Sequence, residues 1–115
     1  MEINLNKMKI QIKPLSVNQA WQGRRFKTPL YKKYEKDLIL LLPKDNYSNK
    51  KLRIMVEFGF SNSASDIDNP LKPFLDILQK KYKINDKQIY QLSVKKTITK
   101  KGNEFINFNI YEIRD

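Results

Sequence analysis

The side chains of this sequence that are best suited to chemistry are carboxylates in its second half. Asp66 and Asp68 stand two residues apart after a short polar stretch, and Asp86 follows further along the chain. In an extended segment, residues two apart point to the same side, so the first two carboxylates repel each other unless a cation lies between them. A divalent metal ion removes that repulsion and acts as a Lewis acid on a phosphate. These three residues are candidate metal ligands, and we expect Asp86 at the same end of the sheet as the other two.

Lys72 is the candidate cationic partner of these acids. It lies in the first turn of a helix that we expect Asp68 or Asn69 to cap, with Pro70 close to the helix start. Its ammonium group would project near the carboxylates, where it can stabilise the negative charge that develops on a phosphate in the transition state. Asn69 has no chemical role in this interpretation beyond that of the cap.

Purely structural interpretations of the same residues remain open. An Asp or Asn before a helix most often serves only as its N-cap. Asp76 is expected to be an exposed helix residue that pairs with Lys72 and Lys80 at a spacing of four. Asp86 can equally be an ordinary turn residue. Spacing alone therefore makes the metal site one hypothesis among several.

The residue types that the chain lacks narrow the chemistry. The sequence contains neither cysteine nor histidine. This excludes disulfides, zinc sites built on thiolates or imidazoles, and catalysis by a cysteine nucleophile or a histidine base. Acid–base or metal chemistry must use carboxylates, lysine or tyrosine, and oxygen ligands favour Mg²⁺, with Mn²⁺ as an alternative.

The charge of the chain points to an anionic partner. The formal net charge is +11, from 23 Lys and Arg against 12 Asp and Glu. A surface this basic attracts DNA, RNA or an anionic membrane over a distance. Lysine enrichment for solubility, or a codon bias toward lysine and asparagine, is the alternative explanation.

Two basic segments are candidate DNA contacts. The first is a loop in which Trp21 and Phe26 are interspersed with basic residues, so cations can bind phosphates while a ring stacks on bases. Alternatively, these rings anchor the loop to the core. The second segment ends the helix after Pro70, where lysines also favour the helix dipole. The candidate DNA-contacting residues are Arg24, Arg25, Lys27, Lys72, Lys80 and Lys81.

The length of 115 residues and the hydrophobic periodicity predict one domain of the α+β class. The first strand ends before Pro14, an irregular segment fills 14–27, and Thr28 caps the first helix. We expect a mixed sheet with two helices packed on it, in the order β-α-β-α-β-β. The expected elements are a strand at 8–13, a helix from 29 to about 42, a strand at 52–60, a helix from about 70 to 82, and strands around 90–94 and 106–110. The residues expected on the buried face of the first helix are Leu30, Tyr34, Leu38, Leu41 and Leu42.

Two further expectations concern the chain as a whole. Lys100 to Asn103 is typical of a hairpin turn between the last two strands. The segment Met1 to Lys13 has no continuous apolar core, and the longest apolar run, 38–42, is far below a membrane span. We therefore expect a cytoplasmic protein without a membrane partner.

The stretch Asp66–Leu78 carries the pattern D-x-D-N-x-x-K-x-x-x-D-x-L, and Asn85–Ile89 follows it as N-D-x-Q-I. Together they resemble the signature of the RusA family of Holliday-junction resolvases, in which the second part reads D-D-x-Q-I. Ser16–Trp21 resembles the N-terminal loop of that family more weakly. The resemblance covers residues 66–89 in detail and most of the chain in the order of its elements.

The resemblance implies a small homodimeric endonuclease of a kind common in prophages, which uses Mg²⁺ to cut four-way DNA junctions symmetrically in recombination and repair. In this sequence Asp66, Asp68 and Asp86 match the catalytic, metal-binding acids, and Lys72 matches the essential lysine. The first acid of the paired D-D is Asn85 here, so we expect Asp86 to carry the role.

Two rival functions remain open. One is a metal-dependent nuclease of the same fold that acts on flaps, nicks or other branched DNA. The other is a non-catalytic basic DNA-binding module, for which the acids would be dispensable. An RNA-binding module is less well supported, because the sequence shows no aromatic-rich strand of the RNP type.

Overall fold

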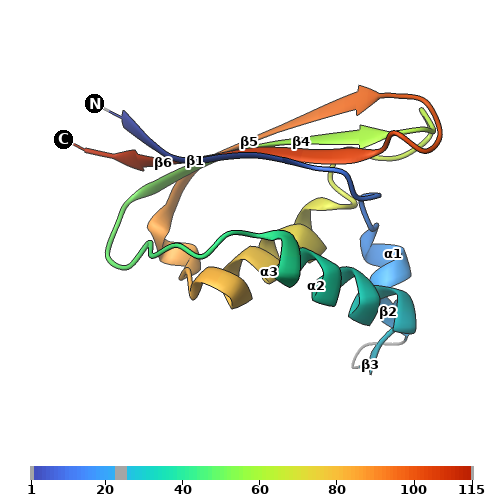
Figure 1. Cartoon of the computed structure of the whole chain (residues 1–115), viewed down its shortest axis with the longest axis horizontal. Helices are drawn as coiled ribbons and strands as arrows, with labels where there is room; N and C mark the ends of the chain where they lie inside the picture. Colours follow the sequence, from blue (N-terminus) through green and yellow to red (C-terminus); the bar gives the residue numbers. More distant parts are fainter. Residues whose placement is uncertain (1, 23–25, 115) are drawn as a thin grey trace.

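The protein is built on one four-stranded mixed sheet, which two helices cover on a single face (Figure 1). The computed structural model describes residues 2–22 and 26–114, apart from the side chains of residues 6, 21 and 22. The strands are β1 (Glu2–Ile10), β4 (Leu52–Phe60), β5 (Ile89–Ile98) and β6 (Phe105–Ile113), in the sheet order β1-β6-β4-β5. Only β4 and β5 pair in parallel. The expected α+β class and mixed sheet are confirmed.

The central strand β4 follows its predicted bounds and pattern. Leu52, Ile54, Val56, Phe58 and Phe60 are all buried, as expected for side chains at period two on the covered face of a sheet. Helix α3 (Leu71–Tyr82) packs on this face through Phe74, whose ring meets those of Phe58 and Phe108 at centroid distances of 5.9 and 5.6 Å. Burial of these aromatic and aliphatic side chains is the main force that holds the helix against the sheet.

Helix α2 (Pro29–Leu41) begins where the sequence predicts, because the Oγ1 of Thr28 accepts a hydrogen bond from the backbone N–H of Tyr31 at 3.1 Å. Its buried face differs from the prediction. Leu30 and Leu41 are 49% and 48% exposed, whereas Tyr31 is buried. The buried stripe runs from Tyr31 through Tyr34 and Leu38 to Leu42, which is one helical face, and the two exposed leucines lie beside it.

The start of α3 contradicts the predicted cap. Pro70 is the N-cap residue, and no side chain caps the helix, so neither Asp68 nor Asn69 has that role. Instead the preceding segment folds into turns, with the N–H of Leu71 donating to the Asp68 carbonyl at 3.1 Å. A capping side chain accepts from the N–H of the second or third helical residue, and the third residue here, Pro73, has no N–H. The Asp68 carbonyl satisfies the N–H of the first helical residue, Leu71. The Asp68 side chain is therefore not used by the helix.

The connection between β5 and β6 is not a hairpin. These strands are not neighbours, because β4 lies between them. Helix α3 carries the chain from β4 to the parallel strand β5, as a parallel pair requires, and β6 then enters on the other side of β4. The segment 99–104 therefore crosses the end of β4, where the Thr99 N–H donates to the Phe60 carbonyl at 2.7 Å. A turn sequence alone does not reveal a strand inserted between its two flanks.

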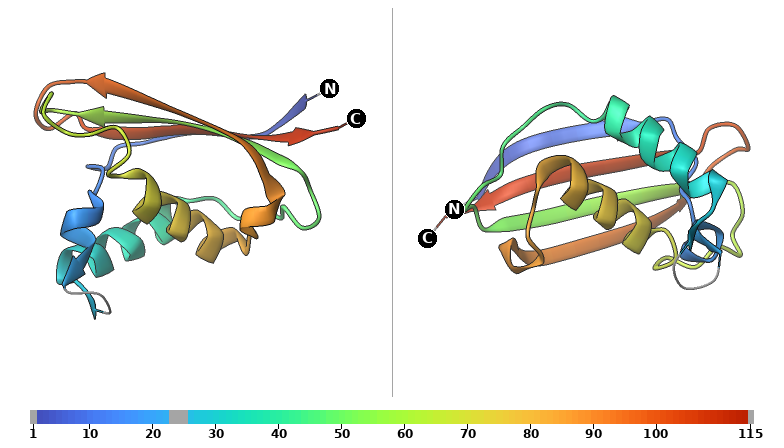
Figure 2. Two further views of the ribbon diagram at one scale, coloured as in Figure 1. Left: turned by 180° about the vertical axis from the view of Figure 1, so that it is seen from behind. Right: turned by 90° about the horizontal axis from the view of Figure 1, so that it is seen from below.

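The N-terminal region contains more regular structure than expected. Strand β1 starts at Glu2 rather than at residue 8, and it ends at Ile10. The segment predicted to be irregular holds helix α1 (Val17–Ala20) and the small strand pair β2 (Trp21–Gln22) and β3 (Phe26–Lys27). These elements are too short to produce a periodic signal. Figure 2 shows them beside the start of α2, and α2 and α3 side by side on the sheet.

Among residues 2–22 and 26–114, no helix has both the length and the apolar character that crossing a membrane requires.

Candidate active site

A cavity of about 250 Å³ runs along the exposed side of α3 and gathers most of the residues singled out above. Helix α3 contributes Lys72, Asp76 and Gln79, which share one face because they are four and three residues apart. The turn before the helix contributes Asp68. The short 3₁₀ helix η1 (Asp86–Gln88), which follows α3, contributes Asp86. Its complete lining is Asp68, Leu71, Lys72, Leu75, Asp76, Gln79 and Asp86; we call this cavity the α3 groove.

The two ends of the α3 groove lie at opposite ends of the sheet, so the expectation of a common end is wrong. Asp66 and Asp68 follow Phe60, the last residue of β4, whereas Asp86 precedes β5, whose first residue pairs with Leu52 at the start of β4. Helix α3 must run back along the sheet before the parallel strand can begin, which separates the acids by its length (Figure 1). In the part of the chain that the structure describes, no three Asp, Glu, His or Cys side chains lie close enough to hold a metal ion.

Asp66 lies outside the α3 groove. Its Oδ2 accepts a 3.4 Å hydrogen bond from the Nδ2 of Asn69, which ties the two ends of the turn together. Asn69 in turn borders a separate polar cavity of about 460 Å³ next to α1. Its carbonyl accepts a 2.8 Å hydrogen bond from the Val17 N–H, so the segment with the weaker resemblance contacts the acidic motif directly.

The loop that carries Asp66 and Asp68 is held by a lysine that sequence reasoning missed. The Nζ of Lys96, on β5, donates hydrogen bonds to the carbonyl oxygens of Ser63 and Ser65, the first at 2.7 Å. This side chain comes from the edge strand that lies parallel to β4, so its role depends on strand pairing and leaves no local signal. Lys96 therefore positions the acidic loop from outside the motif.

Lys72 and Asp76 form the ion pair predicted from their spacing, with Nζ and Oδ2 3.4 Å apart. The second predicted partner of Asp76 is wrong, because Lys80 pairs with Glu35 of α2 instead. At the other end of the α3 groove, the Nε2 of Gln79 donates a hydrogen bond to the Oδ1 of Asp86. The α3 groove thus holds three carboxylates and one lysine in the lining that the structure describes.

Asn85, which replaces the first acid of the family pattern, is engaged locally. Its side chain accepts a 3.0 Å hydrogen bond from the Lys87 N–H, and its own N–H donates to the Oε1 of Gln88 at 2.8 Å. These contacts form a capping box that begins η1. Asp86, and not Asn85, lines the α3 groove.

Three of the predicted DNA-contacting lysines, Lys27, Lys80 and Lys81, have structural contacts with α2. Glu35 is bound by Lys27 at 3.0 Å and by Lys80 at 2.9 Å, and Lys81 donates to the Ile39 carbonyl at 2.9 Å. Partial burial alone would raise the pKa of Glu35, but the hydrogen bonds and charges of the two lysines outweigh burial and hold its pKa below the usual value. Two further candidates, Arg24 and Arg25, lie outside the described residues.

Tyrosine is the remaining residue type that could act as a base, and two tyrosines of α2 are unsuited to it. Burial, together with the negative charges of Asp76 and Glu35, raises the pKa of the Tyr31 phenol to about 12. Burial also raises the pKa of Tyr34 far above its usual value. Both side chains remain neutral at physiological pH.

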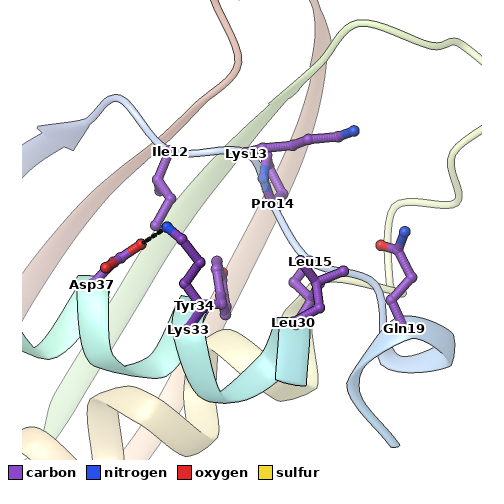
Figure 3. A pocket seen from close by; sticks show the side chains of 9 residues that line it. All are labelled: Ile12, Lys13, Pro14, Leu15, Gln19, Leu30, Lys33, Tyr34 and Asp37. Atoms are coloured by element: carbon purple, nitrogen blue, oxygen red, sulfur yellow. Dashed lines mark hydrogen bonds and ion pairs between the residues drawn. The ribbon is translucent and has the colours of Figure 1, made fainter. Parts of the chain in front are cut away.

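A third cavity, of about 290 Å³, lies between α2 and the segment after β1 (Figure 3). Its walls include Ile12, Leu15 and Leu30, and its one carboxylate, Asp37, is bound by Lys33 at 2.8 Å. A single neutralised carboxylate in apolar surroundings is a poor site for a divalent cation. The α3 groove is therefore the better candidate for metal chemistry.

The family model described as endodeoxyribonuclease RusA matches residues 9–107, which include the acidic motif, the whole of α3 and η1. No individual curated protein matches the sequence. Because the family model spans most of the 115 residues, the chain belongs to the RusA endodeoxyribonuclease family.

Proposed function

We propose that this protein is a divalent-metal-dependent endodeoxyribonuclease that resolves four-way DNA junctions in recombination and repair. The family match supports the nuclease activity and a branched DNA substrate. The observation that carries the proposal is the α3 groove, whose lining includes Asp68, Asp76 and Asp86 in a protein of net charge +11. A concentration of negative charge within so basic a chain opposes DNA binding unless a cation offsets it.

The donor atoms suit the proposed metal. Asp66, Asp68 and Asp86 offer carboxylate oxygens, which Mg²⁺ and Mn²⁺ prefer. Mg²⁺ commonly binds one or two carboxylates and keeps several waters and substrate phosphate oxygens as its other ligands. Asp66 enters this set through the family motif, whereas Asp68 and Asp86 also line the α3 groove.

A two-fold dimer would reconcile the separated acids with one metal site. Within a chain, Asp68 and Asp86 stand at opposite ends of α3. A two-fold axis perpendicular to α3 places the Asp86 end of one chain beside the Asp68 end of the other, and it does so twice. The dimer would then contain two equivalent sites, which suits the symmetric cutting of a junction. The free edge of β5, with Tyr90, Leu92 and Ile98 exposed, offers apolar surface for such an assembly.

The residues of the chain have distinct tasks in this proposal. Asp66, Asp68 and Asp86 bind the cation, and Lys72 contacts the scissile phosphate and stabilises the charge of the pentavalent transition state. When bound, the cation lowers the pKa of a coordinated water and neutralises phosphate charge. Asp76 holds the Lys72 ammonium beside the α3 groove until DNA is bound. The phosphate-binding role of Lys27, Lys80 and Lys81, and of Arg24 and Arg25, is part of the same proposal.

The activity is tested by cleavage of synthetic four-way junctions, flaps and linear duplexes, with and without Mg²⁺. We expect junction cleavage that requires Mg²⁺ and paired cuts on opposite strands. Asp68→Asn should lower the cleavage rate by about 100-fold or more while junction binding persists, because the DNA contacts remain. Stronger cleavage of flaps than of junctions would support the rival nuclease, and strong cleavage of plain duplex with no junction preference would reject junction resolution. If Asp68→Asn cleaves as fast as the wild type, Asp68 is dispensable, as the hypothesis of a non-catalytic DNA-binding module predicts.

The shared site is tested by mixing chains. Asp68→Asn and Asp86→Asn should each be inactive as homodimers. A mixed dimer pairs the intact Asp86 of one chain with the intact Asp68 of the other, so one of its two sites is complete. We expect single-strand nicking of the junction to return in the mixture after dissociation and reassociation of the chains. If the mixture stays as inactive as its parents, each site is built from one chain.

A further inference from the structure

One hydrogen bond in the α3 groove is unused by the mechanism above. The Nε2 of Gln79 donates to the Oδ1 of Asp86, and the contact links the third turn of α3 to η1. Gln79 is half-buried and Asp86 is exposed. A hydrogen bond at an exposed position contributes little to the free energy of folding. We therefore looked for a role of this contact in the proposed metal site.

The backbone beneath Asp86 is already fixed without this contact. Gln88, at the end of η1, donates through its Nε2 to the carbonyls of Tyr47 and Lys50 at 2.7 and 3.1 Å. The capping box of Asn85 fixes the start of η1. The main freedom left to Asp86 is rotation of its side chain, and Gln79 restrains that rotation.

The chemical nature of the donor also matters. A lysine in place of Gln79 would neutralise Asp86 and compete with a cation, whereas a second carboxylate would repel it. A neutral amide donates one hydrogen bond to Oδ1, preserves the full negative charge and leaves Oδ2 available. Hydrogen bonds of this kind from a neighbouring residue orient metal-binding carboxylates in many proteins and raise their affinity for the metal.

We propose that Gln79 is a positioning residue, which holds the Asp86 carboxylate in its metal-binding orientation and thereby sets the affinity of the site for a divalent cation. The inference rests on the proposed metal-dependent nuclease function. It assigns a role to a residue outside the acid and lysine positions of the motif.

The test is the variant Gln79→Met, which keeps the length of the side chain and removes the amide. Mn²⁺ binding to the whole protein is measured by calorimetry, and the Mn²⁺ concentration for half-maximal junction cleavage is measured in parallel. We expect both to weaken by about tenfold or more, within the range known for residues that orient ligands. Cleavage at saturating Mn²⁺ should recover to within about twofold of the wild type, since the proposal gives Gln79 no direct contact with DNA or the cation.

Controls separate this role from a structural one. Gln11→Met makes the same chemical change at an exposed position just after β1, outside the α3 groove, and should leave Mn²⁺ binding unchanged. Gln79→Ala removes the amide by shortening the side chain and should weaken Mn²⁺ binding as much as Gln79→Met does. The Tm of each variant shows whether it is folded. Wild-type Mn²⁺ affinity in a folded Gln79 variant overturns the inference, as does a loss of maximal rate at unchanged affinity. If the wild type cleaves without any divalent cation, the proposed function fails instead.

Discussion

Two clusters of charged side chains at α3 hold their carboxylates in opposite electrostatic situations. Toward α2, one carboxylate, Glu35, lies between two lysines at 2.9 and 3.0 Å, and its side chain is only 15% exposed. In the second cluster, the α3 groove holds three carboxylates against one lysine. The first cluster is satisfied by the protein itself, and the second retains excess negative charge. Excess negative charge of this kind does not stabilise the fold, and it is characteristic of a site that binds a positively charged partner.

The largest difference between the two clusters should appear when a lysine is removed from each. Lys72→Met should reduce the junction-cleavage rate at saturating Mg²⁺ by about 100-fold, because one stabilising contact to the transition-state phosphate is lost. Lys80→Met in the Glu35 cluster should weaken junction binding, but at saturating DNA it should change the cleavage rate by less than about threefold, since this lysine does not line the α3 groove. Single-turnover cleavage measures both.

Asp76→Asn provides the matched control for Lys72, because it removes the partner and keeps the lysine. We expect a loss of about tenfold or less, through a less well-oriented ammonium. If Lys72→Met cleaves at the wild-type rate, the α3 groove is not the catalytic centre. If Asp76→Asn is as damaged as Asp68→Asn, Asp76 belongs among the metal-binding acids.

A smaller effect, on stability, is expected from Glu35→Gln. Gln keeps the shape of the side chain but loses the charge that two lysines share, and we expect the free energy of unfolding to fall by about 1–2 kcal/mol. Asp37→Asn breaks the exposed pair with Lys33 and should lower it by less than about 0.5 kcal/mol. Urea unfolding compares the two, and cleavage by Glu35→Gln should stay within about twofold of the wild type. Equal stability losses would contradict the contrast between a buried and an exposed pair.

The same variant predicts a pH dependence. The pKa of folded Glu35 lies below its usual value of 4.5, so the stability it contributes is complete above that pH and is lost as the pH falls through the lowered pKa. The difference in Tm between the wild type and Glu35→Gln should therefore be constant near neutral pH and shrink below about pH 4.5. Other acids titrate equally in both proteins and cancel in this difference. A gap that widens on acidification would mean that Glu35 is not stabilised in its charged form.

Local sequence signals predicted the regular parts of the fold well. Period-two hydrophobicity located β4 to the residue, and the Thr28 cap with Pro29 located the start of α2. Both signals are properties of a few consecutive residues. The short elements between Val17 and Lys27 gave no such signal, and the exposed Leu30 and Leu41 show that hydrophobic type alone does not decide which side of a helix is buried.

By itself, the sequence determined the chemical types at the site and the family to which they point. Aspartate and lysine side chains at the spacing of 66–86, with no cysteine or histidine in the chain, leave oxygen ligands as the available metal donors. Only the tertiary structure decided where these groups lie. Insertion of β6 beside β4, with α3 running back to a parallel β5, sends Asp86 to the far end of the helix from Asp68. Gln79 and Lys96 acquire their contacts in the same way, because strand order and helix direction are set by the burial of the whole core and not by neighbouring residues.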